Sequence, residues 1–201
     1  IPDLDFKIDK AGLNQLLSYG YIDEQRSIFQ SIKKIQPGTY QFIGEDLSEK
    51  EERYFDIEAI AEQTFESEED LIDQLEKKLK QGFERRLVAD VPVGVFLSGG
   101  IDSSLVASLL AKDRKDIHTY TIGFDHPDYD ESVWAKKISE HLGTKHKEFI
   151  VSLNDVKELI SEIPNIIDEP MGDSSILPTY LVSKMASQEV KVVLSADGGD
   201  E

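Results

Sequence analysis

The sequence contains no cysteine among its 201 residues. A disulfide framework, a thiolate metal site and a cysteine nucleophile are therefore excluded for this chain. Basic residues are also scarce, with 22 Lys and Arg against 40 Asp and Glu, which gives a formal net charge of −18. Such a charge repels phosphate backbones and anionic lipid at long range, so it argues against binding to nucleic acid or to a membrane surface.

Long apolar runs are absent as well. No stretch approaches the roughly 20 residues that a helix needs to cross a bilayer, and the first residues lack the pattern of a signal peptide. We therefore expect a cytoplasmic protein. The histidines (His118, His126, His141 and His146) do not have the HExxH spacing of a zinc site. A hydrophobic fraction of 39% is nevertheless sufficient for a folded core.

The first 56 residues do not contain a self-sufficient core. Apolar residues at helical spacing after Asp9 predict a helix over 9–19. The strand-like TYQFI (39–43) follows a Pro-Gly turn, and we expect it to pair with residues 53–55. The sequence begins with Ile-Pro and ends with Asp-Glu directly after a glycine pair, so we expect a piece of a longer protein.

Much of the acidity lies between Glu45 and Asp73, where GEDLSEKEER and ESEED separate apolar segments. We interpret this run as a solvated linker that leads into the start of a helix. Ser67 resembles the first residue of a capping box, and an apolar residue at every fourth position from Leu71 predicts a helix over 68–88.

Strand-like and helix-like segments then alternate. We expect strands at 93–97, 117–124, 146–151 and 190–195, and helices at 103–112, 131–142, 154–163 and 177–188. This alternation is typical of βαβ units and predicts an α/β fold with a parallel sheet. In such sheets ligands bind beyond the carboxyl ends of the strands.

The segment VFLSGGIDSS (95–104) places a loop of glycine and serine directly after the first of these strands. Glycines let a ligand approach the backbone, serines offer hydroxyls, and the following helix offers free N–H groups. These features predict an anion cradle, and it is not a Walker A loop, because GxxxxGKS/T is absent. The residues concerned are Ser98, Gly99, Gly100, Ser103 and Ser104.

Asp102 lies in the middle of this cradle, where its carboxylate would repel a phosphate. A Mg²⁺ ion between the carboxylate and a pyrophosphate would remove that conflict, because Mg²⁺ in proteins is held by one or two carboxylates together with substrate phosphates. The alternative is a Gly-Ser turn in which Asp102 caps the helix.

Several segments together resemble one family. In order they are RRLVADVPVGVFLSGGIDSS (85–104), TYTIGFDHPDYDES (119–132), HLGTKH (141–146), DEPMGDSSILPTYLVSK (168–184) and VKVVLSADGGDE (190–201). They resemble the synthetase domain of the glutamine-hydrolysing asparagine synthetases, whose SGGxDSS loop is that of the N-type ATP pyrophosphatases. SIFQSIKKIQPGTY (27–40) resembles, more weakly, the end of that family's N-terminal glutaminase domain.

The resemblance implies a fold and a division into domains. Residues 1–56 would be the C-terminal tail of the glutaminase (amidotransferase) domain. Residues 57–201 would be the N-terminal part of a synthetase domain, with a doubly wound parallel sheet of the ATP pyrophosphatase type. The glutaminase nucleophile of the family is an N-terminal cysteine, so this chain cannot hydrolyse glutamine. We expect the piece alone to bind MgATP weakly or not at all and not to turn over.

The resemblance also implies a carbon-nitrogen ligase of asparagine biosynthesis. In this family the β-carboxylate of aspartate attacks the α-phosphorus of ATP, an acyl-adenylate and pyrophosphate form, and ammonia from glutamine displaces AMP. ATP and Mg²⁺ would be the cofactors. The partners would be these small-molecule substrates, with no nucleic acid or membrane, and the full-length protein would be a candidate homodimer.

The family pattern assigns roles residue by residue. The pyrophosphate and Mg²⁺ would be held by Ser98, Gly99, Gly100, Asp102, Ser103 and Ser104. The base would be contacted by Leu97 and Ile122, largely through their backbone. The ribose or α-phosphate region would be lined by Ser195 and Ala196, where the family most often has Gly in place of Ala196. Asp197 would lie near the adenylate as the catalytic residue, and Asp200 would be the second Mg²⁺ carboxylate.

Several of these assignments have simpler alternatives. Leu97 and Ile122 can be ordinary core residues of strands, and Asp197 and Asp200 can belong to a glycine-rich acidic turn. The assignment of two Mg²⁺ carboxylates has support beyond the resemblance. Asp102 and Asp200 both follow predicted strands at the ligand-binding edge of one sheet.

Two further acidic segments each admit two interpretations. DEPMGDSSILP could lie near the amino-acid substrate, or its serines could simply cap a helix. FDHPDYDES could be a loop on the substrate side or a solvated turn with capping acids. The residues are Asp168, Glu169, Asp173, Ser174 and Ser175 in the first segment, and Asp125, Asp128, Asp130 and Glu131 in the second.

Two rival functions remain open at this point. Relatives with the same loop adenylate other carboxylates, for example to close β-lactam rings or to amidate sugars and peptides. The other rival is a non-catalytic nucleotide-binding protein that has kept the fold. Pyrophosphate exchange that depends on aspartate would separate asparagine synthesis from both.

Overall fold

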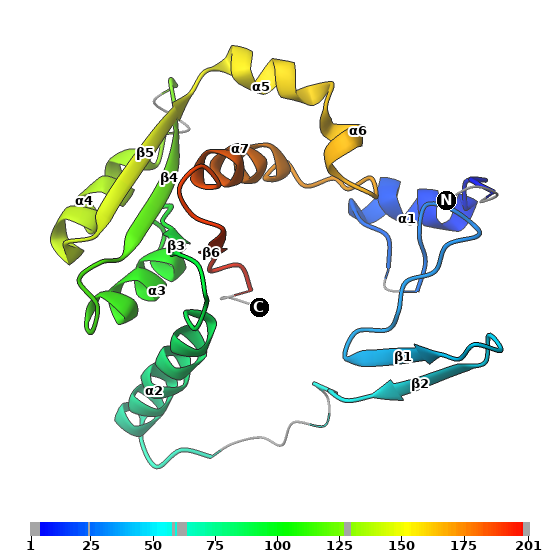
Figure 1. Ribbon diagram of the computed structural model, residues 1–201, viewed down its shortest axis with the longest axis horizontal. Helices are drawn as coiled ribbons and strands as arrows, with labels where there is room; N and C mark the ends of the chain where they lie inside the picture. Colours follow the sequence, from blue (N-terminus) through cyan, green and yellow to red (C-terminus); the bar gives the residue numbers. More distant parts are fainter. Residues whose placement is uncertain (1–4, 24, 58, 60–63, 127–129, 199–201) are drawn as a thin grey trace. The chain divides into compact units, whose positions relative to one another are not determined.

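The computed structural model describes residues 5–23, 25–57, 59, 64–126 and 130–198 (Figure 1). The chain divides into two compact units. The N-terminal unit comprises residues 1–64 together with 162–174, and the sheet unit comprises residues 65–161 together with 175–201. The sequence did not indicate that residues 162–174 pack with the N-terminal residues. The proposed domain boundary after residue 56 stays a prediction.

The N-terminal unit contains α1 (Lys10–Tyr19), β1 (Thr39–Ile43), β2 (Glu49–Arg53) and α6 (Ile163–Ile166). Helix α1 begins where the sequence predicts, because the Asp9 carboxylate accepts a hydrogen bond from the Ala11 amide at 3.1 Å. Gly20 ends the helix with a left-handed φ of 81°.

The partner of β1 differs from the expected one. Strand β2 pairs antiparallel with β1, with Arg53 opposite Thr39, so it lies in the acidic run that we interpreted as a linker. The amides of Tyr54 and Phe55 instead donate to the Gly38 carbonyl at 2.8 and 3.1 Å. The strand was missed because the side chains of β2 are mostly exposed, so they need not alternate between apolar and polar.

The sheet unit is built on four parallel strands in the order β5-β4-β3-β6. The strands are β3 (Val93–Phe96), β4 (His118–Phe124), β5 (Lys145–Val151) and β6 (Val192–Leu194). The helices are α2 (Glu68–Arg86), α3 (Ile101–Ala111), α4 (Ser132–Leu142), α5 (Leu153–Ile160) and α7 (Ile176–Ala186). The parallel sheet confirms the predicted α/β class, and each predicted strand and helix is present with boundaries that shift by a few residues.

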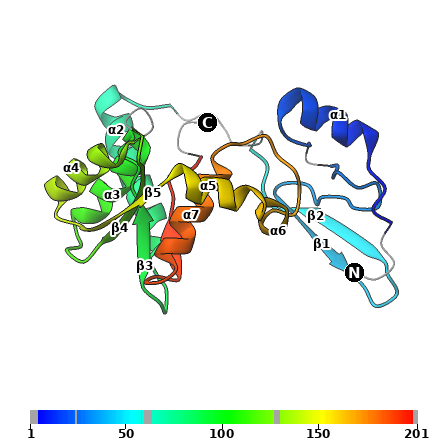
Figure 2. The same ribbon diagram turned by 90° about the horizontal axis from the view of Figure 1, so that it is seen from above.

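Helices cover both faces of this sheet, as in a doubly wound fold. On one face Val95 packs in a cluster with Val106 of α3, against which Phe83 of α2 also packs. On the other face Tyr120 packs with Val182 of α7. Figure 2 shows α7 on the opposite side of the strands from α3 and α4. A strand that is buried on both faces reads as a continuous apolar run, and VGVFL is such a run.

Helix α2 is confirmed, with the Ser67 hydroxyl accepting a hydrogen bond from the Asp70 amide at 3.1 Å. The apolar stripe of α2 extends beyond the part of the helix that packs against the core of the sheet unit. Phe83 packs against the core, whereas Leu71 is 39% and Leu75 is 51% exposed. Neither α2 nor any other helix in the described part of the chain has the length and apolar character of a membrane span.

The His146 ring of β5 predicts a pH dependence of stability. Its Nδ1 atom lies 2.9 Å from the Thr119 hydroxyl, and its buried Nε2 atom has no hydrogen-bond partner among the described residues. Burial lowers the pKa of His146 below its ordinary value of 6.5, and Lys136 lowers it further, whereas Glu148 raises it.

Because the folded state takes up this proton at lower pH than the unfolded chain, we expect stability to fall as the pH drops below about 6.5 and on through the folded-state pKa. His146→Gln should make this fall smaller, whatever its effect on stability at neutral pH. Urea titrations of both proteins at about pH 7.5 and about pH 5 would measure the difference. An unchanged pH dependence in the variant would contradict the assignment to His146.

Candidate active site

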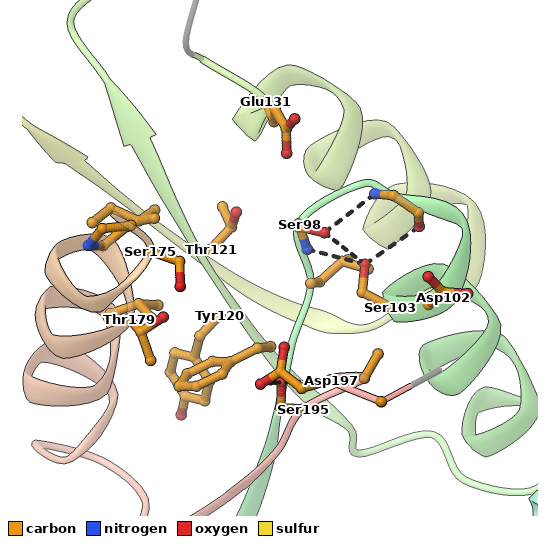
Figure 3. Close-up of a pocket in the computed structure, with 18 of the residues that line it drawn as sticks. Ser98, Asp102, Ser103, Tyr120, Thr121, Glu131, Ser175, Thr179, Ser195 and Asp197 are labelled. Atoms are coloured by element: carbon orange, nitrogen blue, oxygen red, sulfur yellow. Dashed lines mark hydrogen bonds between the residues drawn. The ribbon is translucent and has the colours of Figure 1, made fainter. Parts of the chain in front are cut away.

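A cleft of about 600 Å³ lies at the carboxyl ends of β3, β4 and β6 (Figure 3). Strand β3 leads by α3 to its neighbour β4, whereas β6 lies on the other side of β3 and is reached from β5 through α7. The order of the sheet therefore reverses between β3 and β6. Open α/β sheets bind ligands at such a switch point, and the volume is in the range of ligand pockets, roughly 300–1,000 Å³.

The loop after β3 is held together by its own serines. The Ser98 and Ser103 hydroxyl oxygens are 2.9 Å apart, and the Ser98 amide donates to the Ser103 hydroxyl at 3.2 Å. The Gly100 amide donates to the Ser98 hydroxyl at 3.3 Å. Figure 3 shows Ser98 and Ser103 on one side of the cleft, facing Ser175 and Thr179 of α7 on the other. A hydroxyl both donates and accepts, so these two serines can turn a donor toward a ligand.

The helix that follows the loop has no side-chain cap. Gly100 is the N-cap of α3, whereas Ser67 caps α2 and Ser152 caps α5. Asp102 lies in the first turn of α3 and makes no capping hydrogen bond, so the alternative in which it caps the helix is wrong. An uncapped N-terminus directs N–H groups and the positive end of the helix dipole toward the loop. This is the arrangement that binds anions.

The two glycines of the loop have different surroundings. Gly99 has a φ of 90°, and a Cβ there would lie 2.8 Å from Trp134 Cβ and 2.9 Å from the Ala135 amide nitrogen of α4. A Cβ on Gly100 would meet only the Ser98 hydroxyl, at 3.4 Å. Gly100 lines the cleft and Gly99 does not. The close approach that Gly99 permits in the structure is that of α4, and the expected contact of Gly99 with a ligand stays a prediction.

The part of the cleft between β4 and α7 is largely apolar. Ile122 is half-buried and lines it together with Phe96 and Val182. Tyr120 is only 1% exposed, and burial raises the pKa of its hydroxyl, which donates to Glu189 at 3.2 Å. Leu97 also is 1% exposed, and it packs with Ala107 and Ala135. Its side chain is thus part of the core, and only its backbone can meet a ligand.

Acidic side chains border the cleft, and among the described lining residues there is neither Lys nor Arg. The carboxylates are those of Asp102, Glu131 and Asp197. Asp197 accepts a hydrogen bond from the Ser195 hydroxyl at 2.8 Å, and its amide donates to that hydroxyl at 3.4 Å. A phosphate would be repelled here unless a cation entered with it. In the described part of the chain no three metal-binding side chains come together, so such a cation would need ligand oxygens from the phosphate as well.

The remaining predicted residues are divided between the cleft and other places. Ser195 and Ala196 line the cleft, and Ala196 also packs against the cluster of Val95. Ser104 is not a lining residue, and its hydroxyl donates to the Gly100 carbonyl. Asp200 lies outside the described residues, as does Asp128, so nothing in the structure tests the second Mg²⁺ carboxylate.

In each of the two acidic segments that admitted two interpretations, the structure places some residues at the cleft and others away from it. In the first, Ser175 lines the cleft, whereas Glu169 belongs to the N-terminal unit. In the second, Asp130 accepts a hydrogen bond from the Ser132 amide at 3.1 Å at the start of α4, and Glu131 lines the cleft. Asp125 is exposed at the end of β4 and does not line the cleft.

Sequence reasoning missed the wall that α7 contributes. Pro178, Thr179 and Val182 line the cleft from this helix, as do Tyr120 and Thr121 from β4. The strand residues could have been found, because they precede the predicted carboxyl end of β4. The helical ones carried no signal, since the face that α7 turns to the cleft depends on how it packs on the sheet.

A doubly wound parallel sheet with a glycine-serine loop at its switch point defines an α/β fold whose ligand-binding cleft lies at the carboxyl ends of the strands. Residues 74–201 match the family described as asparagine synthase. The chain belongs to this family.

Similar proteins agree with this membership. A Methanocaldococcus jannaschii protein provisionally named glutamine-hydrolyzing asparagine synthetase 2 is 37% identical over 197 residues, which cover 96% of this chain and 38% of that protein. Glutamine-hydrolyzing asparagine synthetase 1 of Bacillus subtilis is 32% identical over 200 residues, covering 98% of this chain and 31% of that protein. The chain thus spans about a third of the length of these relatives.

Among solved structures, NMN synthetase from Francisella tularensis gives a TM-score of 0.43 at 17% identity, over 60% of this chain and 52% of that chain.

Proposed function

We propose that this chain carries the nucleotide site of an ATP-dependent ligase, which in the full-length protein converts aspartate to asparagine through an aspartyl-adenylate, with ammonia from glutamine. The observation that carries the proposal is the uncapped N-terminus of α3, with the Ser98 and Ser103 hydroxyls beside it, at the switch point of the sheet. Family membership makes the adenylation of aspartate the expected use of such a site. The sheet unit would belong to the synthetase domain, and residues 1–56 to the end of a glutaminase domain.

The two ends of the cleft suit the two ends of ATP. The loop residues and the first amides of α3 would hold the pyrophosphate portion, with Ser98, Gly100 and Ser103 closest to it. The apolar part beside Ile122 would take the adenine base, and the backbone of Leu97 would contribute to it. Gly99 would act by letting the loop lie against α4, and Ser104 by bonding to the Gly100 carbonyl.

The residues after β6 would lie along the reacting end of the nucleotide. Ser195 and Ala196 would line the ribose or the α-phosphate, and Asp197 would lie beside the adenylate. The Ser195 hydroxyl donates to the Asp197 carboxylate and so fixes its orientation. In the reaction a bond forms between an aspartate carboxylate oxygen and the α-phosphorus, and the bond to pyrophosphate breaks. Ammonia then attacks the acyl carbon and AMP leaves with the bonding electron pair.

The acidic lining favours ATP that carries a metal ion over free ATP. Asp102 would hold Mg²⁺ from the first turn of α3, and Asp200 would be the second carboxylate. The chemistry that Mg²⁺ supplies when bound is neutralisation of the charge that accumulates on the departing pyrophosphate. The homodimer of the full-length protein and its location in the cytoplasm stay predictions from the sequence.

The proposal predicts that the full-length protein exchanges labelled pyrophosphate into ATP only when L-aspartate and Mg²⁺ are present. Reversible formation of the aspartyl-adenylate is the physical reason, because exchange requires that the phosphorus–oxygen bond break and re-form. L-Glutamate, which is one methylene longer, is the matched control and should support far less exchange. Exchange that needs a different carboxylate would move the protein to another branch of the family. Nucleotide binding without exchange on any carboxylate would contradict a ligase.

A further inference from the structure

A separate cavity of about 350 Å³ lies at the other end of the strands from the cleft. Val93 and His118 line it, and they are the first residues of β3 and β4, so the cavity lies at the amino ends of these strands. It shares no lining residue with the cleft, and its lining comes from residues 87–118, all of which belong to the sheet unit. Binding at this cavity is therefore independent of the proposed nucleotide site.

The apolar walls of this cavity are aliphatic. Val91 and Val93 line it where it is open to water, since Val91 is 39% exposed and Val93 is half-buried. Val95 and Leu110 line it as well and are buried, so the cavity reaches the core cluster that they form with Ile117. Removing exposed aliphatic surface from water is favourable, so these walls can bind an aliphatic group of a ligand.

Two opposite charges lie at the opening of the cavity. Arg114 and Asp116 line it from the turn between α3 and β4, and both are exposed. In the described part of the chain, neither side chain takes part in an ion pair or a hydrogen bond. Asp113, by contrast, pairs with Lys80 of α2. Arg114 and Asp116 therefore keep both of their charges available to a ligand.

A ligand that matches this cavity carries both charges at one end and an aliphatic group at the other. A guanidinium binds a carboxylate through two parallel hydrogen bonds, and an aspartate accepts hydrogen bonds from an ammonium group. A ligand with a carboxylate alone would be repelled by Asp116, and a ligand with an amine alone would be repelled by Arg114. The half-buried His118 ring adds a nitrogen that donates or accepts. An α-amino acid with an aliphatic side chain has this arrangement of groups.

We propose that this cavity is a binding site for an aliphatic α-amino acid. Arg114 binds the carboxylate of the ligand, Asp116 binds its ammonium group, and Val91 and Val93 cover its side chain. The volume lies at the lower end of the range for ligand pockets, roughly 300–1,000 Å³, which suits a molecule of this size. Aspartate does not fit, because the aliphatic walls would remove its charged side chain from water without a partner. The ligand of this site therefore differs from the proposed substrate.

The parts of the ligand are tested by isothermal titration calorimetry of the full-length protein with L-leucine and analogues of it. Isocaproate lacks only the amino group of leucine, and isoamylamine lacks only its carboxyl group. Each should bind about tenfold more weakly than L-leucine, since each loses one charge-assisted interaction. Glycine keeps both charges and lacks the side chain, so it should bind about tenfold more weakly as well, because the aliphatic walls stay uncovered.

Variants of the two charged residues assign each charge to its part of the ligand. Arg114→Met should weaken L-leucine binding by about tenfold and leave isoamylamine binding unchanged, because that amine has no carboxylate. Asp116→Asn should weaken L-leucine binding by about tenfold and should not weaken isocaproate binding. Lys115→Met is the matched control, because Lys115 lies between the two, is exposed and does not line the cavity. It should bind L-leucine within about twofold of the wild type.

This crossed pattern would establish the site, because a variant that fails to fold loses every ligand alike. If the wild-type protein does not bind L-leucine, or if Arg114→Met and Asp116→Asn bind it as tightly as Lys115→Met does, the proposal is wrong. If isocaproate binds as tightly as L-leucine, the cavity takes a carboxylate and the assignment of an amino acid is refuted. A protein that exchanges no pyrophosphate and still shows the crossed pattern would fail the proposed function and keep this site.

Discussion

Asp102→Asn is expected to reduce aspartate-dependent pyrophosphate exchange by about 100-fold or more in the full-length protein, the size of effect seen when one preorganised electrostatic group is lost. The carboxylate borders a cleft whose described lining contains acids and no base, so we expect a polyphosphate to enter together with a cation. Asparagine has nearly the same shape and cannot neutralise that cation. Initial rates of exchange at saturating aspartate would measure the loss.

Stability should change little in the same variant. Asp102 lies in the first turn of α3 and makes no capping bond, so its charge contributes only the interaction with the helix dipole, about 0.3–1 kcal/mol. Asp113→Asn is the matched control, because Asp113 follows the other end of α3 and pairs with Lys80 on the surface. It should leave exchange within about twofold of wild type, as for other exposed ion pairs.

Titration with Mg²⁺ separates a metal role from a structural one. If Asp102 holds the ion, the variant should need a higher Mg²⁺ concentration for half-maximal exchange and should recover part of its rate as Mg²⁺ is raised. A variant with reduced rate and the wild-type Mg²⁺ requirement would show that Asp102 acts in another way. Full activity in Asp102→Asn would remove this residue from the site altogether.

The sheet and the position of the cleft could be predicted because local signals agreed with the tertiary structure. VGVFL is apolar without interruption since β3 is buried on both faces, and Gly-Gly directly after it marks the turn into α3. Ser67 and Asp9 each start a helix by accepting a backbone hydrogen bond, so capping chemistry alone located those helix ends. Once strands and helices alternate, the ligand-binding edge of the sheet is fixed by topology.

What could not be predicted depends on contacts between distant parts of the chain. Glu169 lies more than a hundred residues from its partners Ile28 and Lys34, and nothing in DEPMGDSS indicates which part of the chain it binds. The acidic strand β2 was not predicted because its side chains are mostly exposed and do not alternate between apolar and polar. The contact of Gly99 with α4 was not predicted for a similar reason, since its neighbours in space, Trp134 and Ala135, are distant in sequence.

Gly99→Ala is expected to lower the free energy of unfolding of the sheet unit by roughly 2–5 kcal/mol. A left-handed backbone costs a residue with a Cβ about 1–2 kcal/mol, and forcing an extra carbon into a packed contact costs about 1–3 kcal/mol. The carbon would lie 2.9 Å from the Ala135 amide nitrogen, which belongs to the backbone of α4 and cannot rotate away as a side chain would. Trp134 is the only tryptophan of this chain, so its fluorescence in urea would report this unfolding.

Gly100→Ala, one residue along, is the matched comparison. Its φ is −71°, and the added carbon would meet only the Ser98 hydroxyl at 3.4 Å, so the cost should stay below about 1 kcal/mol, as for other changes at an uncapped helix start. Because Gly100 lines the cleft, this variant should lose MgATP affinity in spite of its stability. The pair therefore separates packing against α4 from contact with the ligand. The reverse result, with Gly100→Ala the less stable and Gly99→Ala well folded but unable to bind, would mean that Gly99 is the residue that the nucleotide approaches.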